Sequence, residues 1–287
     1  MNPVFAFIGL IILLASDPGD KIIKKEDSVQ NAYPRLSKDA KEILYQSNRS
    51  GKWQLYICDM NGKDLVQLTK DSSDNNLPDW DHENEKIAFV SDRTGDEDIY
   101  LMSRHGSGIK NITHHPGRDI HPYFSPDGRY ILFFSDRVGN QFDIYRYSLA
   151  DGKTERLTDT PEDETCARYS PDMSLIVYLK NSVFSDDVYL LPVRNFLPEN
   201  LSKTPGVYHG WPMFSYDGRW VYYSSMENGT YSIYRIRTDG SNKEPVKEAK
   251  PGEEFARVNV SRDGTFMIYN IKLGHTIWIE YSVLERK

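Results

Sequence analysis

The sequence predicts an all-β protein, a six-bladed β-propeller of four-stranded blades whose ring is closed by an N-terminal strand. The first observation is a pair of an apolar and an aromatic residue that recurs six times, at intervals of 44 or 45 residues. Its aromatic members are Tyr56, Tyr100, Tyr145, Tyr189, Tyr234 and Trp278. A period of ~40–45 residues with four short strands is typical of propeller blades. The second observation is an aromatic content of 13%, which favours strands.

Other marks keep the same interval and the same order. A turn of the type Ser-x-Asp-Gly recurs at residues 125–128, 215–218 and 261–264, with methionine in place of glycine at 170–173 and degenerate copies at 37–39 and 81–83. A proline precedes the turn at Pro34, Pro78, Pro122 and Pro212. A Ser-Asp/Asn-Arg-x-Gly loop contains Arg49, Arg93 and Arg137, and a Leu-Thr-like pair ends each unit. We interpret the arginine series as a shared structural feature and the aromatic residues as core.

The third unit shows how a blade follows from its sequence. Its four strands, called A to D in chain order, are expected at residues 122–125, 130–135, 143–148 and 153–158. Strand B is a continuous apolar run, as in a strand buried on both faces. An Asp-Gly turn separates A from B and another separates C from D; this is a strong hairpin signal because glycine adopts positive φ at little cost.

Six such units fill the chain and the last is incomplete. The blades are expected at about residues 31–74, 75–119, 120–164, 165–208, 209–254 and 255–287. The sixth unit stops after its third strand, and an open edge would expose unpaired backbone groups. We therefore expect residues 21–25 (KIIKK) to supply the missing strand and close the ring. Residues 17–287 would then form one domain.

Residues 1–16 are expected to be a signal peptide. The apolar run of residues 3–15 is shorter than the ~20 residues that span a bilayer, and small residues follow it. Because no basic residue precedes the run, an uncleaved anchor or a buried N-terminal segment is the alternative. After cleavage the protein would be periplasmic or secreted, with no stable membrane span. Cys58 and Cys166 are too isolated to form a disulfide framework and are interpreted as small buried apolar residues.

Charge excludes one class of partner. The chain has 35 basic and 42 acidic residues and a net charge of -7, without a basic stripe. Proteins that neutralise phosphates show such an excess, so nucleic acid is not expected as a partner. The 39% hydrophobic content is sufficient for a large core.

The ordered marks resemble the TolB-type (PD40) β-propeller repeat. The combination of x-Pro-x-x-Ser-Pro-Asp-Gly, an apolar run that ends in Ser-Asp-Arg-x-Gly, an Ile-Tyr pair and Leu-Thr is similar to that repeat over nearly all of residues 31–287. The resemblance implies a six-bladed periplasmic propeller. It also implies protein docking, because the TolB propeller binds the peptidoglycan-associated lipoprotein over the mouth of its channel.

The chain departs from the TolB pattern in one respect. About fifteen residues separate the predicted signal peptide from the first blade, so the N-terminal α/β domain of TolB is not expected here. TolB-type repeats also occur in serine peptidases and in the metal-dependent oligogalacturonate lyases. No Gly-x-Ser-x-Gly nucleophile motif is present, and no hydrolase domain is expected.

The candidate binding residues lie on loops that follow strand D. In propellers these D–A loops and the B–C loops share one face and surround the channel mouth, and function usually resides on such loops. The candidates are His114, His115, Arg118, Asp119, His121, Glu162, Glu164, Tyr208, His209, Trp211, Glu253 and Glu254. Trp211 and Tyr208 are of the type that recognises peptide or sugar, although packing between blades explains them equally well.

The same loops suggest an alternative chemistry. His114, His115, His121 and His209, with Glu162 or Glu164, contain ligand types that bind metals. A metal-dependent polysaccharide lyase or another glycoside-acting propeller enzyme would use such a site. The spacing matches no fixed ligand motif, so we expect ordinary loop histidines, no metal and no other cofactor.

We therefore predict a non-catalytic module that binds a protein or peptide, such as an envelope protein, at the mouth of its channel. The chain is expected to be a monomer. The lyase is the alternative function. A third interpretation is a subunit of a larger assembly that has no ligand of its own.

Overall fold

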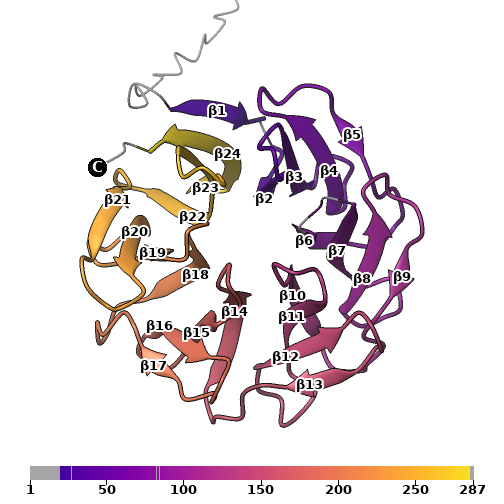
Figure 1. The fold of residues 1–287 in the computed structure, drawn as a ribbon. Helices are drawn as coiled ribbons and strands as arrows, with labels where there is room; N and C mark the ends of the chain where they lie inside the picture. Colours follow the sequence, from indigo (N-terminus) through magenta and orange to yellow (C-terminus); the bar gives the residue numbers. More distant parts are fainter. Residues whose placement is uncertain (1–19, 27, 82, 84, 285–287) are drawn as a thin grey trace, which may run out of the picture.

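Six antiparallel sheets are arranged in a ring around a central channel (Figure 1). The computed structural model describes residues 20–26, 28–81, 83 and 85–284, and the predicted signal peptide lies outside them. Each sheet has four strands, and the described residues contain no helix. None of these residues therefore forms a helix that is long and apolar enough to cross a membrane. The predicted six-bladed propeller of four-stranded blades is confirmed.

In blades 1 to 5 the chain runs from the inner strand A to the outer strand D. Blades 1 to 3 consist of β2 (Asn31–Leu36), β3 (Glu42–Ser47), β4 (Gln54–Asp59), β5 (Val66–Gln67); β6 (Asn75–Trp80), β7 (Lys86–Ser91), β8 (Asp98–Ser103), β9 (Lys110–Asn111); and β10 (Asp119–Phe124), β11 (Tyr130–Ser135), β12 (Asp143–Ser148), β13 (Thr154–Arg156). Blades 4 and 5 consist of β14 (Asp163–Tyr169), β15 (Leu175–Asn181), β16 (Asp186–Pro192), β17 (Glu199–Asn200); and β18 (His209–Phe214), β19 (Trp220–Ser225), β20 (Ser232–Arg237), β21 (Glu244–Lys247). Blade 6 consists of β22 (Glu253–Val260), β23 (Phe266–Leu273), β24 (Thr276–Val283) and β1 (Lys21–Lys24).

The N-terminal strand β1 completes blade 6, as predicted. It pairs antiparallel with β24 and lies beside it at the outer edge of the ring (Figure 1). Ile23 is buried in a cluster that includes side chains of blades 1 and 6. Just before the strand, Asp20 forms an ion pair with Lys247 of blade 5. The segment from Asp20 to Lys24 thus contacts blades 5 and 1, the two neighbours of blade 6.

Two asparagines of blade 6 join the inner strands across that junction. The Asn270 side-chain oxygen accepts a hydrogen bond from the backbone N–H of Tyr33 at 2.9 Å. The Asn259 side-chain oxygen accepts one from the backbone N–H of Leu36 at 3.1 Å. These bonds satisfy backbone groups of β2 that its own sheet leaves unpaired.

The recurring aromatic residue of strand C is half of a cross-strand pair. In blades 1 to 5 it faces an aromatic residue of strand B with ring centroids 5.6 to 6.4 Å apart. The pairs are Tyr45–Tyr56, Phe89–Tyr100, Phe133–Tyr145, Tyr178–Tyr189 and Tyr223–Tyr234. In blade 6 Trp278 lies opposite Ile271. Such pairs are the unit of sheet stabilisation, which explains why this mark is the most regular in the sequence.

Every inner strand contains a β-bulge at its third, fourth or fifth residue. The ladder between strands A and B shifts register there, and the bulged residue has a positive φ between 49° and 57°. The six bulged residues are Tyr33, Leu77, His121, Cys166, Trp211 and Arg257. The four recurrent prolines directly follow a bulge, where the ladder is interrupted and proline's missing N–H costs no hydrogen bond. The sequence did not predict this bulge.

Two element boundaries differ from the prediction for the third unit. Strand A was expected at residues 122–125 but β10 begins at Asp119, because the bulge lets the chain pair on both sides of Pro122. Strand D was expected at residues 153–158 but β13 spans three residues, Thr154–Arg156. An outer strand has one partner strand only, so its pairing ends earlier. Both cysteines are buried, as predicted.

The closing strand gives a stability prediction. Ile23→Ala should lower the free energy of unfolding by about 2 kcal/mol, because it removes buried side-chain atoms between blades 6 and 1. The neighbouring Ile22 is 41% exposed, so Ile22→Ala is the matched control and should change it by less than about 0.5 kcal/mol. Urea unfolding of both variants measures the difference. Equal effects would contradict the packing of β1 against blade 1.

Candidate functional site

The bulged residues of the inner strands meet inside the channel. The hydroxyl of Tyr33 in blade 1 lies 3.4 Å from Nε2 of His121 in blade 3. Arg257 in blade 6 donates a hydrogen bond to the same hydroxyl at 2.7 Å, and its guanidinium stacks between the rings of Tyr33 and Trp211. Contacts between blades that are not neighbours show that these side chains converge on the axis.

A second layer of channel residues follows the bulges by two positions. Arg35 forms an ion pair with Asp79 at 3.2 Å and donates to the Tyr123 hydroxyl at 3.1 Å. Arg168 donates to that hydroxyl at 3.2 Å, with its guanidinium 4.2 Å from the centre of the Tyr123 ring. Asp79 accepts the backbone N–H of Phe124 at 3.0 Å, which fixes the carboxylate between blades 2 and 3.

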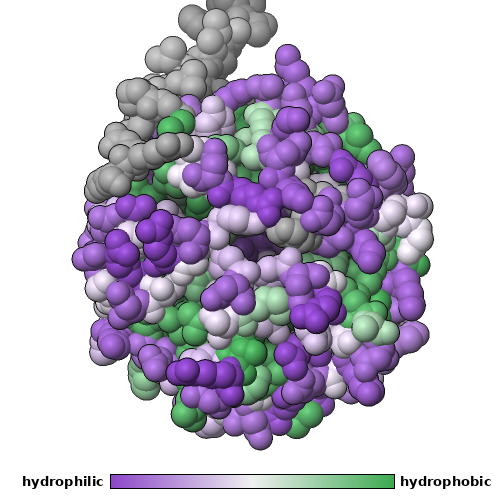
Figure 2. Space-filling model, in the orientation of Figure 1, coloured by the Kyte–Doolittle hydropathy of each residue, from purple (hydrophilic) through white to green (hydrophobic). Residues whose placement is uncertain are grey.

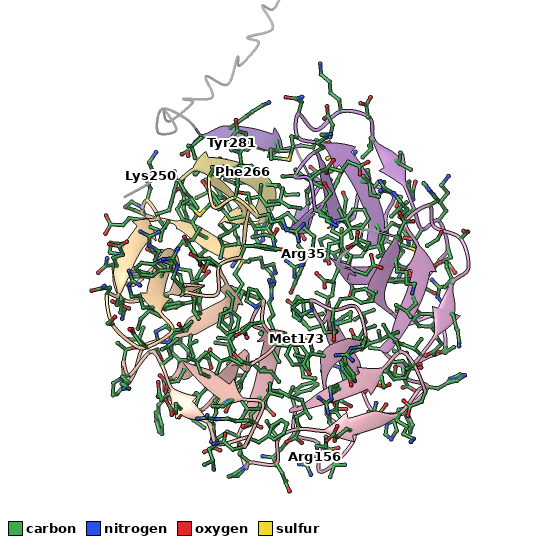
Figure 3. The ribbon with its side chains drawn as sticks, viewed as in Figure 1. Arg35, Arg156, Met173, Lys250, Phe266 and Tyr281 are labelled. Carbon is green, nitrogen blue, oxygen red and sulfur yellow. The ribbon has the colours of Figure 1, made fainter. Side chains whose placement is uncertain are left out.

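This layer forms the floor of a cavity of about 600 Å³. Its walls are the ends of the inner strands and the A–B turns, so it opens on the face opposite the D–A loops; Figure 3 labels Arg35 and Met173 of its lining near the centre of the ring. The space-filling view also shows a hollow at the centre of the ring, with hydrophilic residues around it (Figure 2). The sequence did not predict this cavity, because the candidate residues all came from the D–A loops.

Burial controls the charges in the channel. Desolvation lowers the pKa of Arg35, and the positive charge of Arg168 lowers it further. Desolvation also raises the pKa of Asp79, against the opposing effect of Arg35. The pKa of His121 lies well below its usual value, because the ring is buried and faces the guanidinium groups of Arg257, Arg35 and Arg168. His121 is therefore neutral near pH 7.

The A–B turns at the rim are built by a repeated hydrogen-bond pattern. In blade 3, Ser125 Oγ donates to Asp127 at 2.6 Å and accepts the backbone N–H of Tyr130 at 2.9 Å. The turn then needs a positive φ, which Gly128 supplies at 67°. In blade 4, Met173 adopts the same conformation at 61° and its side chain lines the cavity.

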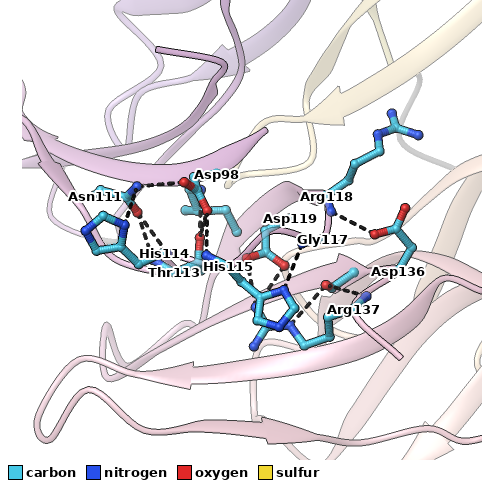
Figure 4. Close-up of polar contacts among 12 residues, drawn as sticks. Asp98, Asn111, Thr113, His114, His115, Gly117, Arg118, Asp119, Asp136 and Arg137 are labelled. Atoms are coloured by element: carbon cyan, nitrogen blue, oxygen red, sulfur yellow. Dashed lines mark hydrogen bonds and ion pairs between the residues drawn. The ribbon is translucent and has the colours of Figure 1, made fainter. Parts of the chain in front are cut away.

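Four candidate residues on the loop between blades 2 and 3 have contacts within the protein (Figure 4). The side chain of Asn111 lies 3.5 Å from His114, and the backbone N–H of Gly117 donates to Nδ1 of His115 at 2.9 Å. Arg118 forms an ion pair with Glu97. Asp119 is fully buried. These contacts hold the loop against its blades, so most of its polar groups are already engaged.

Asp119 belongs to a clamp that recurs in blades 1 to 3. Its carboxylate accepts hydrogen bonds at 2.8 Å from Arg137, whose Nε donates to Ser135 at 3.1 Å and whose guanidinium stacks on the Tyr145 ring. In blades 1 and 2 the corresponding arginine and strand-A residue are Arg49 with Asn31 and Arg93 with Asn75. The arginine of the Ser-x-Arg motif is thus a structural residue, as interpreted from its recurrence.

Blades 4 and 5 carry other residues at these positions. Glu164 takes the place of Asp119 and is fully buried; Thr160 donates to it at 3.0 Å, and burial raises its pKa. His209 takes the same place in blade 5, where its Nε2 lies 3.0 Å from Thr204 Oγ1 and burial lowers its pKa. Neither side chain is available to a partner at the surface.

The three candidate glutamates Glu162, Glu253 and Glu254 also have partners within the protein. Glu162 pairs with Lys180 at 2.9 Å, and Glu254 pairs with Lys272 at the same distance. The Glu253 carboxylate accepts the backbone N–H of Lys250. These contacts are near the surface, on different blades.

The aromatic candidates separate into two environments. Trp211 lies in the channel region, edge-on to Tyr231 and next to Arg257. Tyr208 is half-exposed on the D–A face, and its hydroxyl donates to the carbonyl of Val183 at 3.4 Å. His114, His115, His121 and His209 thus have separate partners. Within the described ranges, no three His, Cys, Asp or Glu side chains are grouped so as to hold a metal ion.

The loss of the clamp in blade 4 is accompanied by exposed apolar side chains. Ser182 stands at the position of the clamp arginine, and the next two residues, Val183 and Phe184, are 84% and 79% exposed. They form the tip of the B–C loop, on the same face as Tyr208. We call Val183, Phe184 and Tyr208 the apolar loop patch.

Sequence reasoning missed Arg35, Asp79, Tyr123 and Arg168, which lie directly after the strand-A proline or its equivalent. A signal was present. These positions differ from blade to blade in charge and size, while their neighbours repeat.

A family model for the TolB β-propeller domain (PD40) matches residues 34–186, a little more than half of the chain. Among curated proteins, an uncharacterized protein of Agrobacterium fabrum is 32% identical over 97 residues. That alignment covers 33% of this chain and 32% of the relative, so it compares only about a third of either protein.

Solved structures with the same fold include TolB proteins. TolB from Acinetobacter baumannii is 20% identical with a TM-score of 0.68, over 93% of this chain and 64% of that chain. A putative TolB from Agrobacterium tumefaciens is 19% identical with a TM-score of 0.70, over 89% and 91%. An oligogalacturonate lyase in complex with manganese is 13% identical with a TM-score of 0.62, over 90% of each chain. At these identities the likeness shows the propeller fold alone.

The clamp gives a second stability prediction. Arg137→Gln should lower the free energy of unfolding by about 3 kcal/mol, because it leaves the carboxylate of Asp119 buried without its ion-pair partner. Arg129→Gln, which breaks an exposed ion pair with Asp127, is the control and should leave the free energy of unfolding nearly unchanged. Urea unfolding tests both, and a small effect of Arg137→Gln would show that the clamp is dispensable.

The buried histidine of the channel gives a pH prediction. Since the pKa of His121 is depressed in the folded protein, below pH ~6.5 the unfolded chain binds a proton that the folded chain does not. The free energy of unfolding should therefore fall as the pH decreases from 6.5, by up to about 1.4 kcal/mol per pH unit. In His121→Gln the free energy of unfolding should fall less between pH 7.5 and 5.5 than in the wild type, as measured by urea unfolding. Parallel dependences for the two proteins would contradict the burial of a neutral His121.

Proposed function

The chain belongs to the TolB β-propeller domain family, and we propose that it is an exported, non-catalytic module that binds a protein or peptide at the loop face of its channel. The proposal rests on one observation, the apolar loop patch. Val183 and Phe184 are the two most exposed large apolar residues of the described chain, and Tyr208 lies against them. Clustered exposed apolar side chains mark interaction sites in soluble proteins.

The loop that carries the patch is held in shape before any partner binds. The backbone N–H of Ser182 donates to the carbonyl of Ser185 at 2.8 Å, and the Ser182 hydroxyl donates to the same carbonyl at 2.8 Å. Tyr208 braces the tip from the neighbouring D–A loop. A preformed loop loses less conformational entropy on binding, which favours affinity.

The expected export of the protein supports a protein partner from the cell envelope. The apolar run of residues 3–15 predicts export, and a TolB-like propeller in the periplasm would meet envelope proteins. The net charge of -7 disfavours nucleic acid. The apolar and aromatic character of the patch instead suits a partner that presents apolar side chains, with Phe184 and Tyr208 as anchors.

The patch can be tested with a matched control on the same face. The variant Val183→Ser/Phe184→Ser removes the apolar tip, whereas Val138→Ser changes an exposed valine at the corresponding loop of blade 3. Proteins captured from an envelope fraction by immobilised wild type are identified by mass spectrometry, and the purified partner is titrated by calorimetry. We expect the double variant to raise the Kd at least tenfold and Val138→Ser to leave it within twofold. Undiminished binding by the double variant would show that this patch is not the docking site.

A further inference from the structure

The channel contains more positive than negative charge. Three guanidinium groups, those of Arg35, Arg168 and Arg257, converge there from blades 1, 4 and 6. Among the described residues, Asp79 is the one carboxylate in ion-pair contact with them. His121 contributes no charge near neutral pH, because burial and then the same arginines lower its pKa. Since arginine stays protonated in proteins, the cluster keeps an excess of two positive charges when Asp79 is ionised.

The cluster also has unused donors. The Nε–H groups of Arg168 and Arg257 are buried and have no hydrogen-bond acceptor among the described residues. Arg35 is 3% exposed, and its neighbours within hydrogen-bond reach are Asp79, a hydroxyl and a backbone carbonyl. Buried charge is costly unless it is paired and hydrogen-bonded. A negatively charged acceptor from outside the chain would balance the excess positive charge and accept hydrogen bonds from the unpaired Nε–H groups.

The cavity brings such an acceptor within reach. Arg35 and Arg168 line its floor together with Tyr123, and its volume of about 600 Å³ is within the range of small-molecule sites. The rim is mixed in charge. Asp127 and Asp172 also line the cavity, but each accepts hydrogen bonds from its own turn, and Asp127 is paired with Arg129. The uncompensated charge is therefore at the floor.

We propose that this cavity is an anion-binding site, in which Arg35 and Arg168 together hold a carboxylate or phosphate group. Guanidinium groups bind both anions with two parallel hydrogen bonds, and the pair would present donors from two blades. Tyr123 fixes the distance between the two arginines by accepting a hydrogen bond from each. The site is on the face opposite the apolar loop patch, so it stands independently of protein docking there.

Isothermal calorimetry and thermal unfolding on the whole chain test the site. The probes are inorganic phosphate, succinate and a tetra-aspartate peptide, each compared with sodium chloride at the same ionic strength. We expect saturable binding and a rise in Tm for at least one probe. Binding of phosphate or succinate assigns the site to a free anion, and binding of the peptide alone assigns it to acidic side chains of a protein.

Two substitutions in the channel should act in opposite directions. Arg168→Gln should weaken binding at least tenfold; this residue is preferred to Arg35, whose ion pair with Asp79 is buried. Asp79→Asn should strengthen binding several-fold, because it removes the competing carboxylate and keeps an oxygen for the backbone N–H of Phe124. Arg219→Gln, on an exposed A–B turn outside the cavity, is the charge-matched control and should leave the Kd unchanged.

Three results would overturn the proposal. They are a response to every probe equal to that to chloride, binding by Arg168→Gln as tight as that by the wild type, and a loss of binding in Arg219→Gln as large as that in Arg168→Gln. The last result would mean that the anion responds to overall surface charge. Circular dichroism of each variant shows whether it is folded; if Arg168→Gln fails to fold, the opposite change expected for Asp79→Asn decides the question.

Discussion

Ring closure by β1 is the constraint on which the rest of the structure depends. A propeller sheet is stable because each blade packs against two neighbours, and the sixth blade of this chain has only three strands of its own. With β1 in place, β2 and β22 become neighbours, and Asn259 and Asn270 bind the backbone of β2. The stacking of Arg257 on Tyr33 crosses the same junction. The channel is thus complete only when β1 pairs with β24.

Repetition and divergence have separate places in this fold. The aromatic pairs, the serine-aspartate turns and the arginine clamp repeat because each blade must solve the same packing and hydrogen-bonding problem. The axis is different, since six side chains share one space there and cannot all be alike. Tyr33, His121, Trp211 and Arg257 illustrate this at one level of the channel, where a stacked guanidinium lies between two aromatic rings. Chemistry specific to this chain is therefore concentrated in the channel and at the loops where the repeat fails.

Most of the fold could be predicted from the sequence, and most of the site could not. The 44- or 45-residue interval predicted the blades, and the missing fourth strand predicted β1, because both follow from local pattern and from the cost of an open edge. The role of the candidate residues on the D–A loops follows neither from the repeat interval nor from the cost of an open edge. Asp119 and His209 are buried and hold loops in place. A polar residue in a loop can have this structural role as readily as it can bind a ligand, and the sequence does not distinguish the two. The channel cluster depends on contacts between blades 1, 3, 4 and 6, which no local pattern contains.

Hydrogen exchange at the closing junction tests this account most directly. Measured by mass spectrometry on the folded protein, the backbone amides of residues 21–24 that pair with β24 should exchange as slowly as those of the other outer strands, such as β21. The amides of Tyr33 and Leu36, which bind asparagine side chains of blade 6, should be protected as well. Rapid exchange of residues 21–24, together with unprotected amides in β2, would mean that the ring is open at this junction and would contradict the central claim.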